Sequence, residues 1–163
     1  MALYRLLLSV FGPIFLLKVF RREGWRGAKL RLVVSRPKMP APHVWIHGAS
    51  NGELGSAKPV IMALRATRPD LALLVTTNSA SGVDMVRGWA LPGVTALPAP
   101  LDLAWLSRRV MVRWRIVAHI TLEAELWPNR ILVCPGPVLL LGARMREGTT
   151  RLWTRLHPLG PRV

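Results

Sequence analysis

The sequence contains little cysteine and few acidic residues. Its 163 residues include one cysteine, Cys134, and eight aspartates and glutamates, against 23 lysines and arginines. A single cysteine excludes a disulfide framework within the chain and a cysteine-based zinc cluster. The four histidines form no H-x-x-x-H pair, which excludes the helix of a zinc protease, and the acidic residues do not resemble an EF-hand. We therefore expect no metal site.

The shortage of acidic residues leaves a net charge of +15, which predicts an anionic partner. Nucleic acid, a phosphorylated ligand and an acidic membrane surface are the classes of partner that such a charge favours. The basic stretch 108–115 does not single out nucleic acid, because Val110 and Trp114 are spaced as the apolar face of a helix with arginines on its polar side. The sequence has no recognisable nucleic-acid-binding motif, so we expect no nucleic-acid partner.

The first twenty residues are mostly apolar, although Arg5 and Lys18 interrupt them. They approach the ~20 residues of a spanning helix only if both charges lie at the membrane interfaces, and Gly12-Pro13 predicts a kink in the middle. A cluster of lysines and arginines follows, as expected on the cytoplasmic side of a membrane. Residues 1–35 are therefore interpreted as an N-terminal membrane anchor, a membrane-associated helix that lies in the interface or dips into it. The alternative is a buried first helix of the domain.

Residues 36–42 hold three prolines and are interpreted as an extended linker. After them, short apolar runs alternate with segments of helical periodicity. This alternation predicts an α/β domain over residues 43–163, a Rossmann-like parallel sheet with helices on both faces and ligands beyond the carboxyl ends of its strands. The expected strands cover residues 44–47, 71–77, 94–97, 116–122 and 138–142, and the expected helices cover residues 53–67, 82–90, 103–113 (with Asp102 as its N-cap), 126–132 and 146–156.

The loop after the first expected strand offers a candidate catalytic residue. Ser50 and Glu53 have the S-x-x-E spacing of a capping box, in which Glu53 serves only to cap a helix. A carboxylate in the first helical turn is also stabilised by the helix dipole. At the carboxyl end of a strand it suits a general base that accepts a hydroxyl proton. The spacing alone leaves both interpretations open.

Two further loops carry polar residues next to strand ends. Thr77 and Ser79 lie at a strand-to-helix turn that either binds an anion through free backbone N–H groups or caps the helix that follows. Glu123 and Glu125 would point the same way on an extended segment, whereas on a turn they could cap the next helix. An acidic pair of this kind is also typical of a solvated loop.

In chain order, these loops resemble the N-terminal domain of the 3-deoxy-D-manno-octulosonic acid (Kdo) transferases, lipid A-specific enzymes of the GT-B glycosyltransferase class. The resemblance covers nearly the whole chain, including the apolar N-terminal segment and its basic flank. Its most specific run is E-A-E-L-W-P-N at residues 123–129. The other matching runs are H-G-A-S-N-G-E at 47–53 with Lys58-Pro59, L-V-T-T-N-S-A-S-G at 74–82, P-L-D at 100–102 and Ala143-Arg144.

The resemblance implies a reaction, a location and a set of site residues. Such enzymes transfer Kdo from CMP-Kdo to the lipid A precursor of lipopolysaccharide at the cytoplasmic face of the cell inner membrane, with no metal or other cofactor. Their N-terminal domain binds the anionic acceptor, and Glu53 matches the general base that acts on the acceptor hydroxyl. The implied substrate-binding positions are Ser50, Asn51, Gly52, Thr77, Ser79, Glu123, Glu125, Asn129 and Arg144.

A GT-B enzyme binds its nucleotide sugar mainly on a C-terminal domain, and the sequence contains no such domain. We therefore expect this sequence to be the acceptor-binding half, inactive alone, either as a fragment of a longer protein or with a separate C-terminal GT-B half as its catalytic partner. The alternative function is that of a non-catalytic, membrane-bound remnant that binds anionic lipid.

Overall fold

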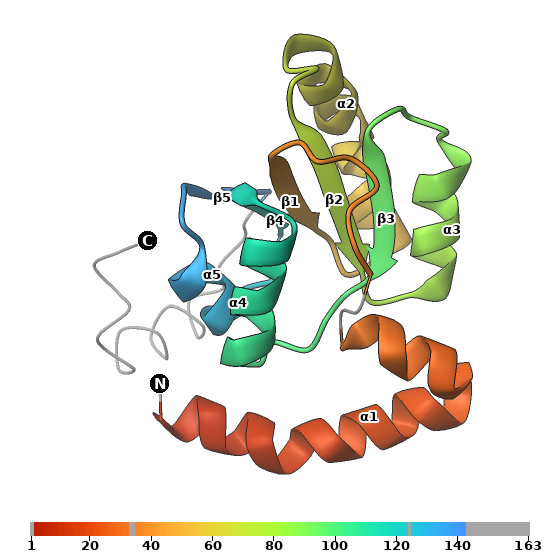
Figure 1. Cartoon of the computed structure of the whole chain (residues 1–163). Coiled ribbons are helices and arrows are strands. Elements are labelled where there is room, and N and C mark those ends of the chain that lie inside the picture. The colour runs from red at the N-terminus through yellow and green to blue at the C-terminus, as the bar shows by residue number, and fades with distance from the viewer. Residues whose placement is uncertain (1, 33–34, 124, 143–163) are drawn as a thin grey trace.

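The computed structural model describes residues 2–32, 35–123 and 125–142, and its centre is a sheet of five parallel strands (Figure 1). Their order is β3-β2-β1-β4-β5, so the chain starts in the middle, fills one side and then crosses to the other. The direction of winding changes between β1 and β4, which is where ligands bind in open α/β sheets. The expected parallel sheet is confirmed, with strands β1 (His43–His47), β2 (Ala72–Thr77), β3 (Val94–Pro98), β4 (Ile116–Leu122) and β5 (Val138–Leu141).

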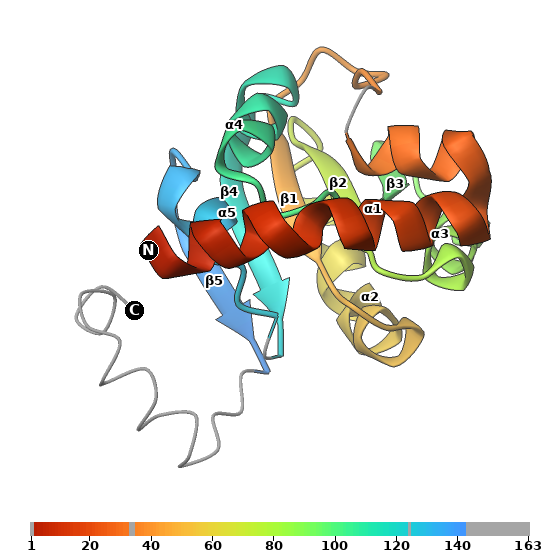
Figure 2. The same ribbon diagram turned by 90° about the horizontal axis from the view of Figure 1, so that it is seen from below.

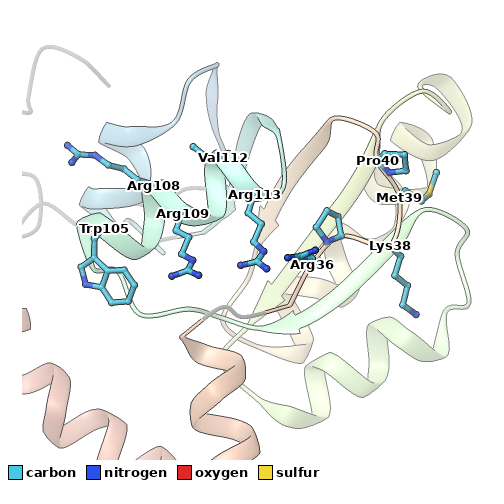
Figure 3. Close-up of a pocket in the computed structure, with 10 residues that line it drawn as sticks. Arg36, Lys38, Met39, Pro40, Trp105, Arg108, Arg109, Val112 and Arg113 are labelled. Carbon is cyan, nitrogen blue, oxygen red and sulfur yellow. The ribbon is translucent and has the colours of Figure 1, made fainter.

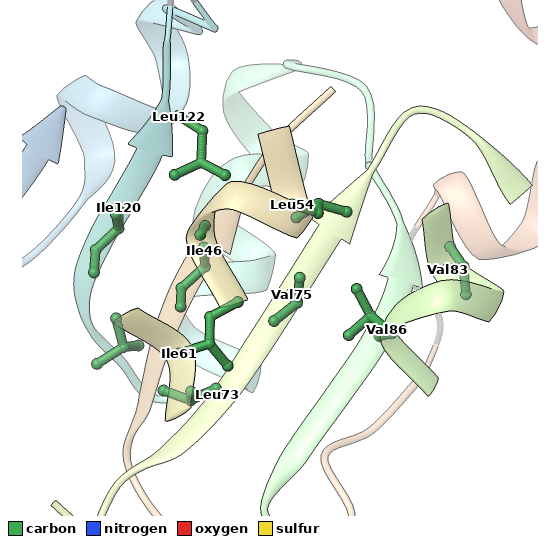
Figure 4. Packing of buried hydrophobic residues seen from close by; sticks show 12 residues of the cluster. Ile46, Leu54, Ile61, Leu73, Val75, Val83, Val86, Ile120 and Leu122 are labelled. Carbon is green, nitrogen blue, oxygen red and sulfur yellow. The ribbon is translucent and has the colours of Figure 1, made fainter. Parts of the chain in front are cut away.

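Helices cover both faces of the sheet, as predicted, because its strands carry apolar side chains on both sides. On one face, Leu54 and Ile61 of α2 belong to the same buried cluster as Ile46 of β1 (Figure 4). On the other face, Trp45 of β1 shares a second buried cluster with Trp114, directly after α4. The first face is covered by α2 (Asn51–Thr67) and α3 (Ala80–Gly88), and the second by α4 (Ala104–Arg113) and α5 (Pro128–Val133).

The first helix, α1 (Ala2–Arg31), breaks once and turns back on itself next to the sheet (Figures 1 and 2). The break is at Gly24, whose φ of 68° lies in the left-handed region that glycine adopts without strain. The reversal of the chain therefore lies at Gly24, whereas Gly12-Pro13, where the sequence predicts a kink, keeps helical backbone angles. Among the described residues, no helix combines the length and the hydropathy that crossing a membrane requires.

Both ends of α1 are bonded to loops at the carboxyl ends of strands. The Tyr4 hydroxyl donates to Oδ2 of Asp102, after β3, at 2.8 Å. The buried guanidinium of Arg31 donates to the backbone carbonyls of Asn78 at 3.1 Å and Ala99 at 3.4 Å. α1 therefore lies along the edge of the sheet where ligands of this fold bind.

Asp102 does not cap the helix that follows it, so that prediction is wrong. The N-cap of α4 is Leu103, which makes no side-chain cap bond. Asp102 instead accepts hydrogen bonds from the backbone N–H groups of Asn129 and Arg130, both at 2.9 Å, and thereby caps α5. The physical reason is proximity in space, since the loop after β3 packs on the start of α5. The expected last helix, 146–156, lies outside the described residues.

Candidate functional site

The loop after β1 forms the predicted capping box at the carboxyl edge of the sheet. Ser50 is the N-cap of α2 and accepts a hydrogen bond from the backbone N–H of Glu53 at 3.2 Å. The Glu53 carboxylate turns back to accept from the Ser50 hydroxyl at 3.1 Å and from the backbone N–H of Ala49 at 2.7 Å. Two donors therefore orient this half-buried carboxylate at the start of α2.

Asn51 and Ser79 meet across the N-termini of α2 and α3. Ser79 Oγ donates to Asn51 Oδ1 at 3.1 Å, and Asn51 Nδ2 donates to Ser81 Oγ at 3.3 Å. Ser79 also accepts from a backbone N–H of α3, so the predicted helix cap is confirmed. Thr77 is buried and donates to the backbone carbonyl of Ala49 at 3.1 Å. Its hydroxyl therefore fixes the loop after β1.

A histidine, a glutamate and a tryptophan meet between β1 and β4. His47 Nε2 lies 3.3 Å from Glu125 Oε2, and Trp127 Nε1 donates to the same oxygen at 2.9 Å. The other ring nitrogen of His47, Nδ1, lies 3.0 Å from the hydroxyl oxygen of Thr76. The His47 side chain is 0% exposed and that of Glu125 is 25% exposed, so Glu125 is the member of this pair that is open to solvent.

The histidine in this group is neutral at neutral pH. Burial lowers the pKa of His47 to about 4, and the positive charge of Arg130 lowers it further. The hydrogen bond from His47 lowers the pKa of Glu125, and the one from Trp127 adds to this effect. The contacts with His47 and Trp127 therefore keep Glu125 ionised and fix its carboxylate. Nδ1 of His47 also lies 3.1 Å from the backbone carbonyl oxygen of Thr76, and Trp127 Nε1 lies 3.1 Å from His47 Nε2.

Arg130 is a fully buried cation behind the histidine group. Its guanidinium lies 5.1 Å from the ring centroids of both Trp45 and Trp127. Its Nε lies 3.8 Å from Asp102 Oδ1, and another of its nitrogens donates to the backbone carbonyl of Pro100. Burial lowers the pKa of Arg130 to about 10, which leaves it charged at neutral pH. This fixed charge favours anionic ligands at the switch point.

The remaining predicted positions lie in different surroundings. Asn129 is buried and donates to the backbone carbonyl of Asp102 at 2.5 Å, so it supports the fold. Glu123 occupies a turn with a φ of 52°, and neither it nor Glu125 caps α5, because Asp102 does so. Gly52 is exposed on α2. Arg144 lies outside the described residues.

Sequence reasoning missed three residues of this edge. His47 ends a buried strand, Trp127 lies inside the most specific matching run, and Arg130 follows that run. A histidine at the last position of a core strand was an available signal, because a buried imidazole needs polar partners. Among the described residues, no group of three histidine, cysteine, aspartate or glutamate side chains is placed to hold a metal ion.

Comparison with known proteins gives consistent matches. Residues 25–163 match the family model described as 3-Deoxy-D-manno-octulosonic-acid transferase (kdotransferase). A probable mitochondrial 3-deoxy-D-manno-octulosonic acid transferase of Arabidopsis thaliana is 34% identical, over 74% of this chain and 28% of the relative. The 3-deoxy-D-manno-octulosonic acid transferase of Chlamydia trachomatis serovar D is 32% identical, over 93% of this chain and 37% of the relative. The chain thus spans about a third of the length of the curated relatives it matches.

Among solved structures, the D-arabinose dehydrogenase from Sulfolobus solfataricus aligns with a TM-score of 0.44. The two sequences are 16% identical, and the alignment covers 72% of this chain and 37% of the dehydrogenase.

Proposed function

The chain belongs to the 3-deoxy-D-manno-octulosonic-acid transferase family, and from this premise we propose that it is the acceptor-binding half of a GT-B Kdo transferase. The proposed reaction moves Kdo from CMP-Kdo, a donor substrate, to the lipid A precursor. The observation that carries the proposal is the position of Glu53, a carboxylate oriented by two donors at the edge where ligands of this fold bind. The donor site in this proposal lies on a C-terminal GT-B half.

In the proposed step, a hydroxyl of the acceptor attacks the anomeric carbon of Kdo, and Glu53 takes the hydroxyl proton. The new carbon–oxygen bond forms as the bond to the CMP phosphate breaks, and CMP leaves with the bonding electrons. The Ala49 N–H and the Ser50 hydroxyl hold the carboxylate in one orientation and leave its remaining lone pairs for the acceptor. A positioned general base contributes ~10²–10⁴-fold to the rate.

The same edge offers groups that suit a phosphorylated sugar. The side chain of Asn51 and the hydroxyls of Ser79 and Ser81 supply donors and acceptors at the start of α2 and α3. Glu125 supplies a fixed acceptor at the switch point, with the charge of Arg130 behind it. The net charge of +15 favours an anionic acceptor.

The proposal places the chain at the cytoplasmic face of the inner membrane through α1. Val10, Ile14 and Leu17 are exposed and spaced along one side of the helix, and the exposed Lys18 and Arg21 follow. A helix that combines an apolar side with basic residues binds an anionic membrane interface. The lipid acceptor would then reach the carboxyl edge of the sheet, along which α1 lies.

Glu53→Gln tests the proposed base, with the full chain combined with the C-terminal half of a curated relative. Glutamine at this position keeps the capping contacts, so the free energy of unfolding should fall by less than ~1 kcal/mol. Kdo transfer from CMP-Kdo to the lipid A precursor should fall by ~10²–10⁴-fold. Both quantities are measured on the same preparation.

Asp70→Asn is the matched control for that experiment. It likewise neutralises one carboxylate, but Asp70 is exposed, pairs with Arg68 at 2.8 Å and precedes β2, at the opposite end of the strands from Glu53, so the transfer rate of this variant should stay close to that of the wild type. Full activity of Glu53→Gln would remove the base from the proposal. Vesicle binding without any transfer by the wild-type pair would support the non-catalytic lipid-binding alternative instead.

A further inference from the structure

A groove of about 940 Å³ lies between the segment 36–40 and the outer side of α4 (Figure 3). In Figure 3, Arg109 and Arg113 reach from α4 toward Arg36 of the segment, so like charges face one another. No acidic residue lines the groove, and none of its basic residues forms an ion pair with another described residue. Its basic residues are Arg36, Lys38, Arg108, Arg109 and Arg113.

This charge arrangement matches a phosphate group. Cations that face one another across a groove repel, and an anion placed between them replaces that repulsion with attraction. Four of the five cations are arginines, whose planar guanidinium binds phosphate through two parallel hydrogen bonds. The groove is therefore suited to a phosphate-bearing ligand rather than to a neutral one.

Two large apolar side chains that line the groove are exposed to solvent and do not pack in the core. Val110 and Trp114 fill the inner side of α4 and are buried, which confirms the predicted apolar face of this helix. On the outer side, Trp105 is 54% exposed and Val112 is 78% exposed. Tryptophan favours the boundary between lipid and water, and arginine can lay its aliphatic stem on apolar groups while its charge meets headgroups.

The Trp105 end of the groove lies near the loop to which α1 is bonded. Trp105 lies at the start of α4, three residues after Asp102, to which Tyr4 of α1 is bonded at 2.8 Å. Exposed apolar side chains of α1, such as Ile14 and Leu17, give nucleic acid nothing to bind but suit a bilayer. A lipid surface is thus the one partner whose chemistry fits both features.

We propose that the groove between residues 36–40 and α4 binds the phosphate-bearing headgroup of an anionic membrane lipid, with Trp105 at headgroup level. The inference deepens the proposed function, because it rests on the membrane association of α1. It adds a second attachment point, on the outer side of α4. Two attachment points would fix how the carboxyl edge of the sheet faces the membrane.

The test is sedimentation of the full chain with phosphatidylcholine vesicles that either contain or lack phosphatidylglycerol. Arg109→Gln/Arg113→Gln should lower the partition coefficient on anionic vesicles roughly 30-fold, the factor expected for two basic residues at an anionic surface. Trp105→Ala should weaken binding to both kinds of vesicle. Unfolding curves of each variant confirm that α4 remains folded.

A control of equal charge is Arg68→Gln/Arg87→Gln, which removes two surface arginines that pair with Asp70 and Asp84 outside the groove. This variant should bind anionic vesicles within about 3-fold of the wild type, because its arginines lie away from the proposed surface. Equal losses in the two double variants would mean unspecific charge attraction and would overturn the groove proposal.

Other results separate the groove from the rest of the proposed function. A wild-type chain that binds neither kind of vesicle would overturn the membrane association itself. Normal vesicle binding by the groove variant would overturn the groove alone and leave the role of α1 intact. Complete competition by inorganic phosphate would identify a site for free phosphate. Loss of oligonucleotide binding in the groove variant, without loss of vesicle binding, would identify a nucleic-acid site. Either this result or complete competition by inorganic phosphate would contradict the binding of a lipid headgroup.

Discussion

The neutral ring of His47 ties the stability of the protein to pH. Its folded pKa of about 4 lies below the ordinary value of 6.5, and burial likewise lowers the pKa of His119 to about 3. Between pH 6.5 and 4 the unfolded chain therefore binds protons that the folded chain does not bind. The stabilisation from these two residues is fully present above pH 6.5 and is lost as the pH falls.

We accordingly expect the free energy of unfolding to decrease as the pH falls from 7 to 4. His47 should account for a loss on the order of 3 kcal/mol, at ~1.4 kcal/mol per pKa unit. His47→Gln removes the titrating ring, so its stability should depend less steeply on pH. Urea denaturation of both proteins at several pH values measures this dependence, and parallel profiles would contradict it.

At the scale of elements, Gly136 fixes the approach of the chain to β5. A Cβ at this position would overlap the backbone carbonyl oxygen of Val117 in β4. β4 is held between β1 and β5 and cannot move aside as a flexible side chain could. The segment that enters β5 therefore requires the residue without a side chain.

Gly136→Ala should destabilise the protein by ~1–3 kcal/mol or more, the usual cost of overpacking. Gly55→Ala is the matched control, because Gly55 lies inside α2 with no atom within 4 Å of an added Cβ. Alanine there should stabilise the helix by ~0.5–1 kcal/mol. Thermal unfolding of the two variants gives the sign of each change, and equal midpoints would refute the steric explanation.

Elements with a local signal were predictable from the sequence, and those that depend on distant contacts were not. The start of α2 follows from the S-x-x-E spacing of Ser50 and Glu53, and the parallel sheet follows from the alternation of apolar runs. The cap of α5 by Asp102 escaped prediction, because the two segments are 27 residues apart in sequence. The contact of His47 with Glu125 spans 78 residues and depends on the pairing of β1 with β4.

For the whole molecule, α1 contributes to the stability of the domain on which it lies. Removal of residues 1–23 deletes Tyr4 and its bond to Asp102, and should lower the free energy of unfolding by ~1.5–3 kcal/mol, the value of a hydrogen bond to a charged group. Removal of residues 1–35 also deletes Arg31 and its bonds to two loop carbonyls, and should cost more. Urea denaturation orders the three proteins, and equal stabilities would show that α1 packs too loosely to matter.

The strand order also decides how the molecule assembles during synthesis. β1 pairs on one edge with β2, which follows soon after it in the sequence. The other edge of β1 pairs with β4, which leaves the ribosome much later. Until then one edge of β1, which contains Trp45 and Ile46, is unpaired, and unpaired strand edges can pair with strands of neighbouring chains. Joining strands that are distant along the chain is slow, because a long loop must close first. We therefore expect the pairing of β1 with β4 at the switch point to form late, and the nascent protein to be most sensitive to aggregation before it forms.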